Sequence, residues 1–344
     1  MRSIRWVGAS VLGLLAATAL MVGLLAGTDV AGQTKPQAIL DPAQAGEDYV
    51  FQGEYEGTIE TDNGQTTFGA QVVALGNGVF YGVGYPGGLP GKGWNEYEKH
   101  EGEGRRQGNV VVFEAPEGQR AELKRERNTV VIVLYDASGL LMGRLRKVQR
   151  KSPTLGKKPP KGAVVLFDGS SPENFENGRM TPDGLLMQGC RSKARFGSAR
   201  IHLEFMTPYM PEARGQARGN SGVYVQGRYE VQILDSFGLE GRINECGAIY
   251  GVKPPRINMC LPPLTWQTYD IEFHAAKFDE NGKKIANARM SVWHNGVLIH
   301  RDVEIPGATR AAILPEGPEP GPLYLQDHGN PVRFRNIWLV QLED

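Results

Sequence analysis

Alternating polar side chains on several predicted strands are the groups in this chain that could do chemistry. Within residues 229–235, a period of two places Glu230 and Gln232 on one face and apolar side chains on the other. Two further segments repeat this pattern, with His202 and Glu204 sharing a face in 201–205, and Tyr324, Gln326 and His328 sharing a face in 323–328. Glu, Gln, His and Tyr side chains bind sugars and move protons. We therefore expect a sheet whose polar face is the floor of a carbohydrate site.

Glu230 is the first candidate for an acid–base residue. A carboxylate between Tyr229 and Val231 in the centre of a sheet costs free energy unless it is paired or partly wet. Partial burial would raise its pKa toward the range in which a general acid or base works. His328 is the second candidate, because the unperturbed pKa of histidine suits proton transfer near neutral pH. With Gln232, which shares the face of Glu230, they form the predicted catalytic set.

A second group of polar side chains is expected to hold the substrate. Asn220 and Tyr224 alternate onto one face of the strand that precedes Glu230, although Asn220 also suits a simple turn. Arg333 and Arg335 leave the core on one face; they could hold a ligand or pair with a glutamate of the sheet. The predicted substrate-binding residues are Glu204, Asn220, Tyr224, Gln326, Arg333 and Arg335.

Short strands joined by tight turns must position these groups. The chain contains 45 glycines, and hairpin signals such as Asn295-Gly296 separate its apolar runs. Residues 162–344 alternate strands and turns throughout, which favours an antiparallel sandwich or jelly roll. Residues 33–146 predict a smaller β-rich domain, and the basic, proline-containing segment 147–161 predicts a solvated linker. The predicted fold class is therefore all-β.

The N-terminal segment predicts export. Arg2 and Arg5 precede a long apolar run, and Val30-Ala31-Gly32 offers small residues suited to signal-peptidase cleavage. Residues 1–32 are thus a signal peptide or, since the apolar run is long, an uncleaved membrane anchor. We expect a periplasmic, cell-surface or secreted protein. Export would permit a Cys246–Cys260 disulfide, although free buried thiols agree equally well with three cysteines.

Composition and missing motifs limit the classes of partner and cofactor. Lys plus Arg and Asp plus Glu are both 38, so no net charge favours nucleic acid, and membrane contact is expected only through an uncleaved N-terminal segment. The chain lacks a zinc-binding spacing, a G-x-S-x-G elbow and a phosphate-binding loop. No cofactor is predicted, but a divalent cation held by carboxylate oxygens leaves weak traces in a sequence and stays open.

Several ordered motifs in the second half resemble the 3-keto-disaccharide hydrolase domain family, over roughly residues 162–342. The motifs are Leu166-Phe167-Asp168-Gly169, Gly219-Asn220-Ser221-Gly222-Val223, the 229–235 strand, Gly247-Ala248-Ile249-Tyr250, Trp266, Asn295-Gly296, Leu325-Gln326-Asp327-His328 and the 332–337 strand. The resemblance implies a concanavalin A-like jelly roll that cleaves glycosides whose ring carbon 3 is a ketone. A base would remove the acidified hydrogen on carbon 2, and the group on carbon 1 would leave before water adds.

On this resemblance, Glu230 or His328 is the base, and Gln232, Asn220 and an arginine stabilise the oxyanion. The substrate is then an oligosaccharide or glycoside. The same fold also builds lectins, so a non-catalytic carbohydrate-binding module is the alternative. A glycosidase with two carboxylates is a third reading, but Gln232 stands where such an enzyme would often place an acid.

Overall fold

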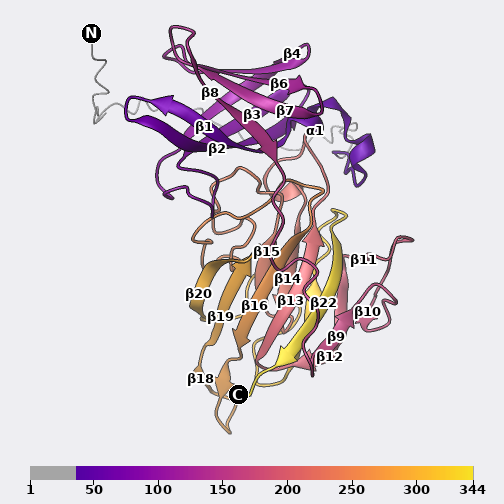
Figure 1. The fold of residues 1–344 in the computed structure, drawn as a ribbon. Coiled ribbons are helices and arrows are strands. Elements are labelled where there is room, and N and C mark those ends of the chain that lie inside the picture. The colour runs from indigo at the N-terminus through magenta and orange to yellow at the C-terminus, as the bar shows by residue number, and fades with distance from the viewer. Residues whose placement is uncertain (1–35, 344) are drawn as a thin grey trace, which may run out of the picture. The chain divides into compact units, whose positions relative to one another are not determined.

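The computed structural model describes residues 36–343, which form a closed barrel and a two-sheet sandwich (Figure 1). The predicted targeting segment, residues 1–32, lies outside the described residues. Within the described part of the chain, no helix is long and apolar enough to cross a membrane. The predicted fold class, all-β with a C-terminal jelly-roll sandwich, is confirmed.

Eight antiparallel strands close the barrel, because β1 pairs with both β2 and β8. The strands are β1 (Gly53–Thr61), β2 (Gly64–Gly76), β3 (Val79–Pro86), β4 (His100–Gln107), β5 (Val110–Glu114), β6 (Arg120–Glu126), β7 (Thr129–Tyr135) and β8 (Leu141–Val148). A 3₁₀ turn, η1 (Pro42–Gln44), and a short helix, α1 (Gly46–Phe51), precede them. Alternate side chains such as Tyr55, Phe80 and Leu123 fill the interior, so the barrel is a packed core.

Two antiparallel sheets form the sandwich. The five-stranded sheet has the order β10 (Phe175–Glu176), β12 (Cys190–Phe196), β21 (Gly321–Leu325), β14 (Ser221–Val225), β15 (Tyr229–Ile233). The seven-stranded sheet has the order β11 (Leu186–Met187), β22 (Arg333–Gln341), β13 (Ala199–Met206), β16 (Gln267–His274), β19 (Ala288–His294), β20 (Val297–Ile305), and β9 (Val164–Phe167) also pairs with β22. A separate hairpin joins β17 (Lys277–Phe278) to β18 (Lys284–Ala286), and η2 (Gly215–Ala217) is a 3₁₀ turn before β14.

The two sheets share one hydrophobic core. Val223 and Val231 from the five-stranded sheet belong to the same buried cluster as Leu203, Phe205 and Ile271 from the seven-stranded sheet. Since successive side chains of a strand point to opposite faces, the residues between these core positions point outward from the sandwich. The polar residues of β15 and those of β13 therefore lie on opposite outer faces.

The segment predicted as a solvated linker lies along the outer face of the seven-stranded sheet. Ser152 is buried and its hydroxyl is 2.6 Å from that of Thr268. The Thr154 hydroxyl donates to Asp270 at 2.7 Å, and the Gly156 backbone N–H donates to Glu204. Residues 157–161 are exposed, whereas Ser152, Thr154 and Gly156 bind outward polar groups of β13 and β16. All three cysteines of the sandwich are buried and free.

Candidate functional site

A polar pocket of about 240 Å³ lies on the outer face of the five-stranded sheet. Strands β14 and β15 are neighbours in that sheet and supply its floor, and loops, including the one that follows β21, supply its walls. The lining residues are Gln216, Asn220, Tyr224, Glu230, Gln232, Tyr250, Arg310, Ala311, Gln326 and His328. The structure thus brings together all three predicted catalytic residues and three of the predicted substrate-binding residues, Asn220, Tyr224 and Gln326.

Strand register sets the centre of the pocket. Tyr224 of β14 is paired directly with Glu230 of β15, and Gly222 is paired with Gln232. A Cβ atom at position 222 would lie 2.2 Å from Oε1 of Glu230, far inside van der Waals contact. The absence of a side chain at Gly222 therefore makes the space that the Glu230 carboxylate occupies.

Burial tunes the acidity of Glu230. Only 2% of this residue is exposed. Burial disfavours the charged carboxylate and raises its pKa to about 7, although the neighbouring Tyr224 hydroxyl opposes the shift. Near neutral pH, Glu230 is therefore divided between its protonated and ionised forms. It can accept a proton from a ligand and later return it.

Tyr224 links the floor of the pocket to one of its walls. Its hydroxyl donates to the Arg310 carbonyl at 2.9 Å and accepts from Nε2 of Gln326 at 3.2 Å. Burial raises the pKa of Tyr224, so the phenol stays neutral and remains a donor. Thr309, the neighbour of Arg310, accepts from the Glu230 backbone N–H at 2.9 Å. These bonds hold the 309–311 loop over Glu230.

Arg310 is the positively charged side chain of the pocket lining, and sequence reasoning missed it. It is exposed, and it precedes Ala311, whose φ of 60° is unusual for a residue with a side chain. The loop has no periodic pattern that could have indicated a site. An arginine here can stabilise negative charge that develops on a bound ligand.

Asn220 and Gln232 do not fit the predicted role of oxyanion donors. Nδ2 of Asn220 donates to the backbone carbonyl of Gln216 at 2.7 Å and to its Oε1 at 3.3 Å. Nε2 of Gln232 donates to the same Oε1 at 3.1 Å and to the Asn244 carbonyl at 3.5 Å. Because protein acceptors occupy both amide nitrogens, these side chains have no free donor for an enolate oxygen. Gln216 and Asn244 were not singled out in the sequence.

The structure places His328 in the pocket lining, just after β21, where its ring is exposed. Its ring is therefore accessible to solvent as well as to a ligand. Tyr250 completes this side of the pocket, and its backbone N–H donates to the Glu230 carbonyl at 3.1 Å.

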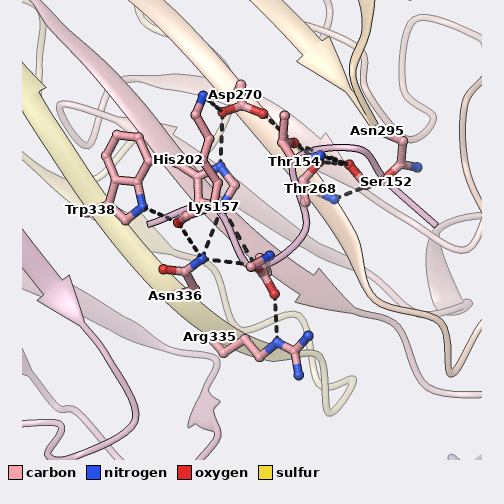
Figure 2. A network of polar contacts seen from close by, with 12 residues as sticks. Ser152, Thr154, Lys157, His202, Thr268, Asp270, Asn295, Arg335, Asn336 and Trp338 are labelled. Carbon is pink, nitrogen blue, oxygen red and sulfur yellow. Dashed lines mark hydrogen bonds and ion pairs between the residues drawn. The ribbon is translucent and has the colours of Figure 1, made fainter. Parts of the chain in front are cut away.

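Glu204 and Arg335 lie outside the pocket, in a polar network on the outer face of the seven-stranded sheet (Figure 2). Nε of Arg335 donates to Glu204 at 2.7 Å, and Asn336 donates to its other oxygen at 2.9 Å. Burial opposes ionisation of Glu204, but hydrogen bonds from His202, Asn336, Arg335 and Gly156 lower its pKa to about 2. Since the 152–158 segment covers this carboxylate, Glu204 has a structural role.

Arg333 is also separated from the pocket. It is buried on β22, where its guanidinium donates to Oε1 of Gln188 at 3.1 Å and to the Val332 carbonyl at 3.2 Å. The expectation that Glu204, Arg333 and Arg335 face one ligand with Glu230 is therefore wrong: their strands belong to the other sheet. Among residues 36–343, no cluster of three His, Cys, Asp or Glu side chains could hold a metal ion, and a divalent cation stays an open prediction.

An acid of raised pKa, an arginine and several amides line one pocket on a sandwich sheet, a set of groups suited to binding a polar ligand. The model of the 3-keto-alpha-glucoside-1,2-lyase-like domain family matches residues 162–340. The chain belongs to this family, and is thus a carbohydrate-active protein of the glycoside-acting kind. None of the curated proteins matches the chain.

Two solved structures from Parabacteroides distasonis, each named a "putative glycosyl hydrolase", are similar to this chain. One is 32% identical, with a TM-score of 0.48, and the match covers 54% of this chain and 85% of the other. The second is 17% identical, with a TM-score of 0.37, and the match covers 53% of this chain and 95% of the other.

Proposed function

We propose that this protein is an exported enzyme that cleaves 3-keto-glycosides by elimination and hydration. The observation that carries the proposal is Glu230, a buried carboxyl group with a pKa of about 7 that lines the same pocket as Arg310 and His328. A ketone on carbon 3 acidifies the hydrogen on carbon 2. A base whose pKa lies near the working pH suits its removal.

In the proposed reaction, the Glu230 carboxylate takes the proton from carbon 2. The electron pair of that bond forms a double bond between carbons 2 and 3, and the carbon 3 oxygen becomes an enolate. Arg310 stabilises this oxygen, because it is the cation of the pocket lining. The enolate then restores the ketone, a double bond forms between carbons 1 and 2, and the carbon 1 oxygen departs with a proton from His328. Water adds to carbon 1, and carbon 2 regains a proton.

The composition of the pocket argues against a glycosidase with two carboxylates. That mechanism needs a second Asp or Glu across the scissile bond. Glu230 is the sole carboxylate among the residues that line this pocket in the described chain. Elimination from a 3-keto-glycoside needs one base, and an imidazole can supply the acid.

The test is product analysis on matched substrates. The purified protein is incubated with a 3-keto-glucoside and with the same glucoside unoxidised, and released aglycone is quantified. We expect release from the keto substrate alone. Glu230→Gln, which keeps the shape of the side chain and removes the base, should lower turnover by about 10²- to 10⁴-fold.

His328→Ala is tested with two leaving groups. We expect a large loss with a poor leaving group and a smaller loss with a nitrophenol, which departs without a proton. Near-normal turnover in both variants would disprove the assignment of roles. Tight binding of the keto-glucoside without any turnover would instead indicate a carbohydrate-binding module.

A further inference from the structure

The amides of the pocket leave two buried oxygen atoms without a hydrogen-bond partner. These are Oδ1 of Asn220 and Oε1 of Gln232, and each residue is only 1% exposed. Both residues line the pocket beside Glu230. A buried acceptor that lacks a partner costs free energy, so native proteins leave few of them. Of the seven buried side-chain atoms without a partner in residues 36–343, these two belong to residues that line one pocket, where a bound ligand can supply the missing donors.

Gln216 determines which end of each amide is free. Its Oε1 accepts from both Asn220 and Gln232, and its own Nε2 donates to the Asn244 carbonyl at 2.8 Å. If either neighbouring amide were reversed, its oxygen would face the oxygen of Gln216. Each amide is therefore held with its nitrogen toward Gln216 and its oxygen free.

We propose that Asn220 and Gln232 form a subsite that recognises two hydroxyl groups of a sugar ring, and that Gln216 is the residue that positions them. The oxygens accept hydrogen bonds but cannot donate them, so the complementary groups are donors. Hydroxyl groups meet this requirement, whereas ketone, ether and carboxylate oxygens do not. The subsite therefore holds parts of the sugar that stay hydroxylated, and this inference deepens the proposed function on which it rests.

The subsite should select against sugars that lack one hydroxyl group. When such a sugar binds, one buried oxygen is left without the donor that the parent sugar supplies, and this costs binding free energy. The penalty appears in binding, so it can be measured on sugars that the protein does not cleave. The test is thereby separated from the elimination reaction.

The experiment measures the dissociation constants of methyl α-glucoside and its 2-, 3-, 4- and 6-deoxy analogues by titration calorimetry or by ligand-observed NMR. With the unmodified protein, we expect at least two of the four analogues to bind about tenfold or more weakly than the parent sugar. Equal binding of all four analogues would overturn the subsite. So would the absence of any binding of the parent sugar at accessible concentrations.

Variants at position 216 test the positioning role. Gln216→Ala frees both amides to rotate, so the parent sugar should bind more weakly and the deoxy analogues should approach it in affinity. Gln216→Glu keeps an oxygen that accepts from both amides and should preserve most of the discrimination. Gln65→Ala, which removes an exposed glutamine hydrogen-bonded to Glu60 on the barrel, is the matched control.

The outcomes distinguish the proposed elimination reaction from the proposed hydroxyl-recognising subsite. Undiminished discrimination in Gln216→Ala would show that Gln216 does not position the amides. Failure to cleave a 3-keto-glucoside, together with clear selection against deoxy sugars, would refute the proposed reaction and leave the subsite standing. The series on the unmodified protein decides the subsite even if a variant at position 216 does not fold.

Discussion

The Glu230 carboxylate occupies the space beside Gly222 that the side chain of any larger residue at position 222 would fill. Gly222 lies on β14, next to the strand that carries Glu230, and a Cβ there would approach Oε1 to 2.2 Å. The glycine is part of a strand whose five residues are all buried, so the neighbouring backbone has little room to move. The position of the proposed base is thus set by the absence of a side chain on its neighbour.

Gly222→Ala should displace the carboxylate. We expect a loss of turnover of about tenfold or more, because a small misplacement of a catalytic group is costly. The overpacked site should also lose about 1–3 kcal/mol of the free energy of unfolding. Kinetics on a 3-keto-glucoside and urea unfolding measure the two effects. Gly102→Ala is the control, since a Cβ at Gly102 meets nothing within 4 Å. Equal turnover in both variants would contradict the steric argument.

The pH dependence of turnover should follow Glu230. Its carboxylate is the active form of the base, and its pKa is raised to about 7. On a nitrophenyl 3-keto-glucoside, whose leaving group needs no proton from His328, we therefore expect kcat/KM to be low in acid, to rise with pH, and to reach half of its plateau near pH 7. A profile measured from pH 5 to 9 on this substrate checks this. Half-maximal activity near pH 4.5, the ordinary value for a glutamate, would show that burial does not shift the base.

The same shift predicts a pH-dependent cost in stability. Between the ordinary pKa of 4.5 and the folded value of about 7, the native state holds a proton that the unfolded state has released. The contribution of Glu230 to the free energy of unfolding is therefore fully present below pH 4.5 and decreases as the pH rises toward 7. Glu230→Gln removes this dependence. In urea unfolding, the variant should gain stability relative to the unmodified protein between pH 4.5 and pH 8, and a constant difference would contradict the burial argument.

The periodicity of single strands was enough to predict much of the pocket. Alternation places Tyr224, Glu230 and Gln232 on the strand face opposite the apolar core residues, because the side-chain period of a strand is two. The alternation of side chains along a strand does not determine which sheet that strand joins. Glu204 alternates outward as Glu230 does, but β13 lies in the other sheet, so the two carboxylates end on opposite outer faces.

Other features of the pocket and of the fold leave no recognisable pattern in the local sequence. Arg310 reaches the pocket because Tyr224 and the Glu230 backbone bind its loop, and these contacts depend on tertiary structure. Strand β4 contains no apolar residue, so a pattern search misses it; hydrogen bonding to β3 and β5 makes it a strand. The position of the 152–158 segment likewise depends on polar groups of β13 and β16 that are distant in sequence.

The separation of the two faces predicts opposite effects for two arginines. Arg310 lines the pocket, whereas Arg335 donates to the buried Glu204 and stacks on Trp266, with its guanidinium carbon 4.0 Å from the ring centroid. Arg310→Ala should lower kcat/KM for a 3-keto-glucoside by about 10²- to 10³-fold, because the enolate loses its cation. Its unfolding free energy should barely change, since the side chain is exposed.

Arg335→Ala should do the reverse. Glu204 keeps its bonds from Asn336 and Gly156 but loses a charged partner, which should cost about 1–3 kcal/mol of unfolding free energy. Turnover should stay within about twofold of the unmodified protein, because the network faces away from the pocket. Measuring both quantities for both variants gives four values from one set of preparations. A large loss of turnover in Arg335→Ala with stability intact would place the reaction on the seven-stranded sheet, against the pocket described above.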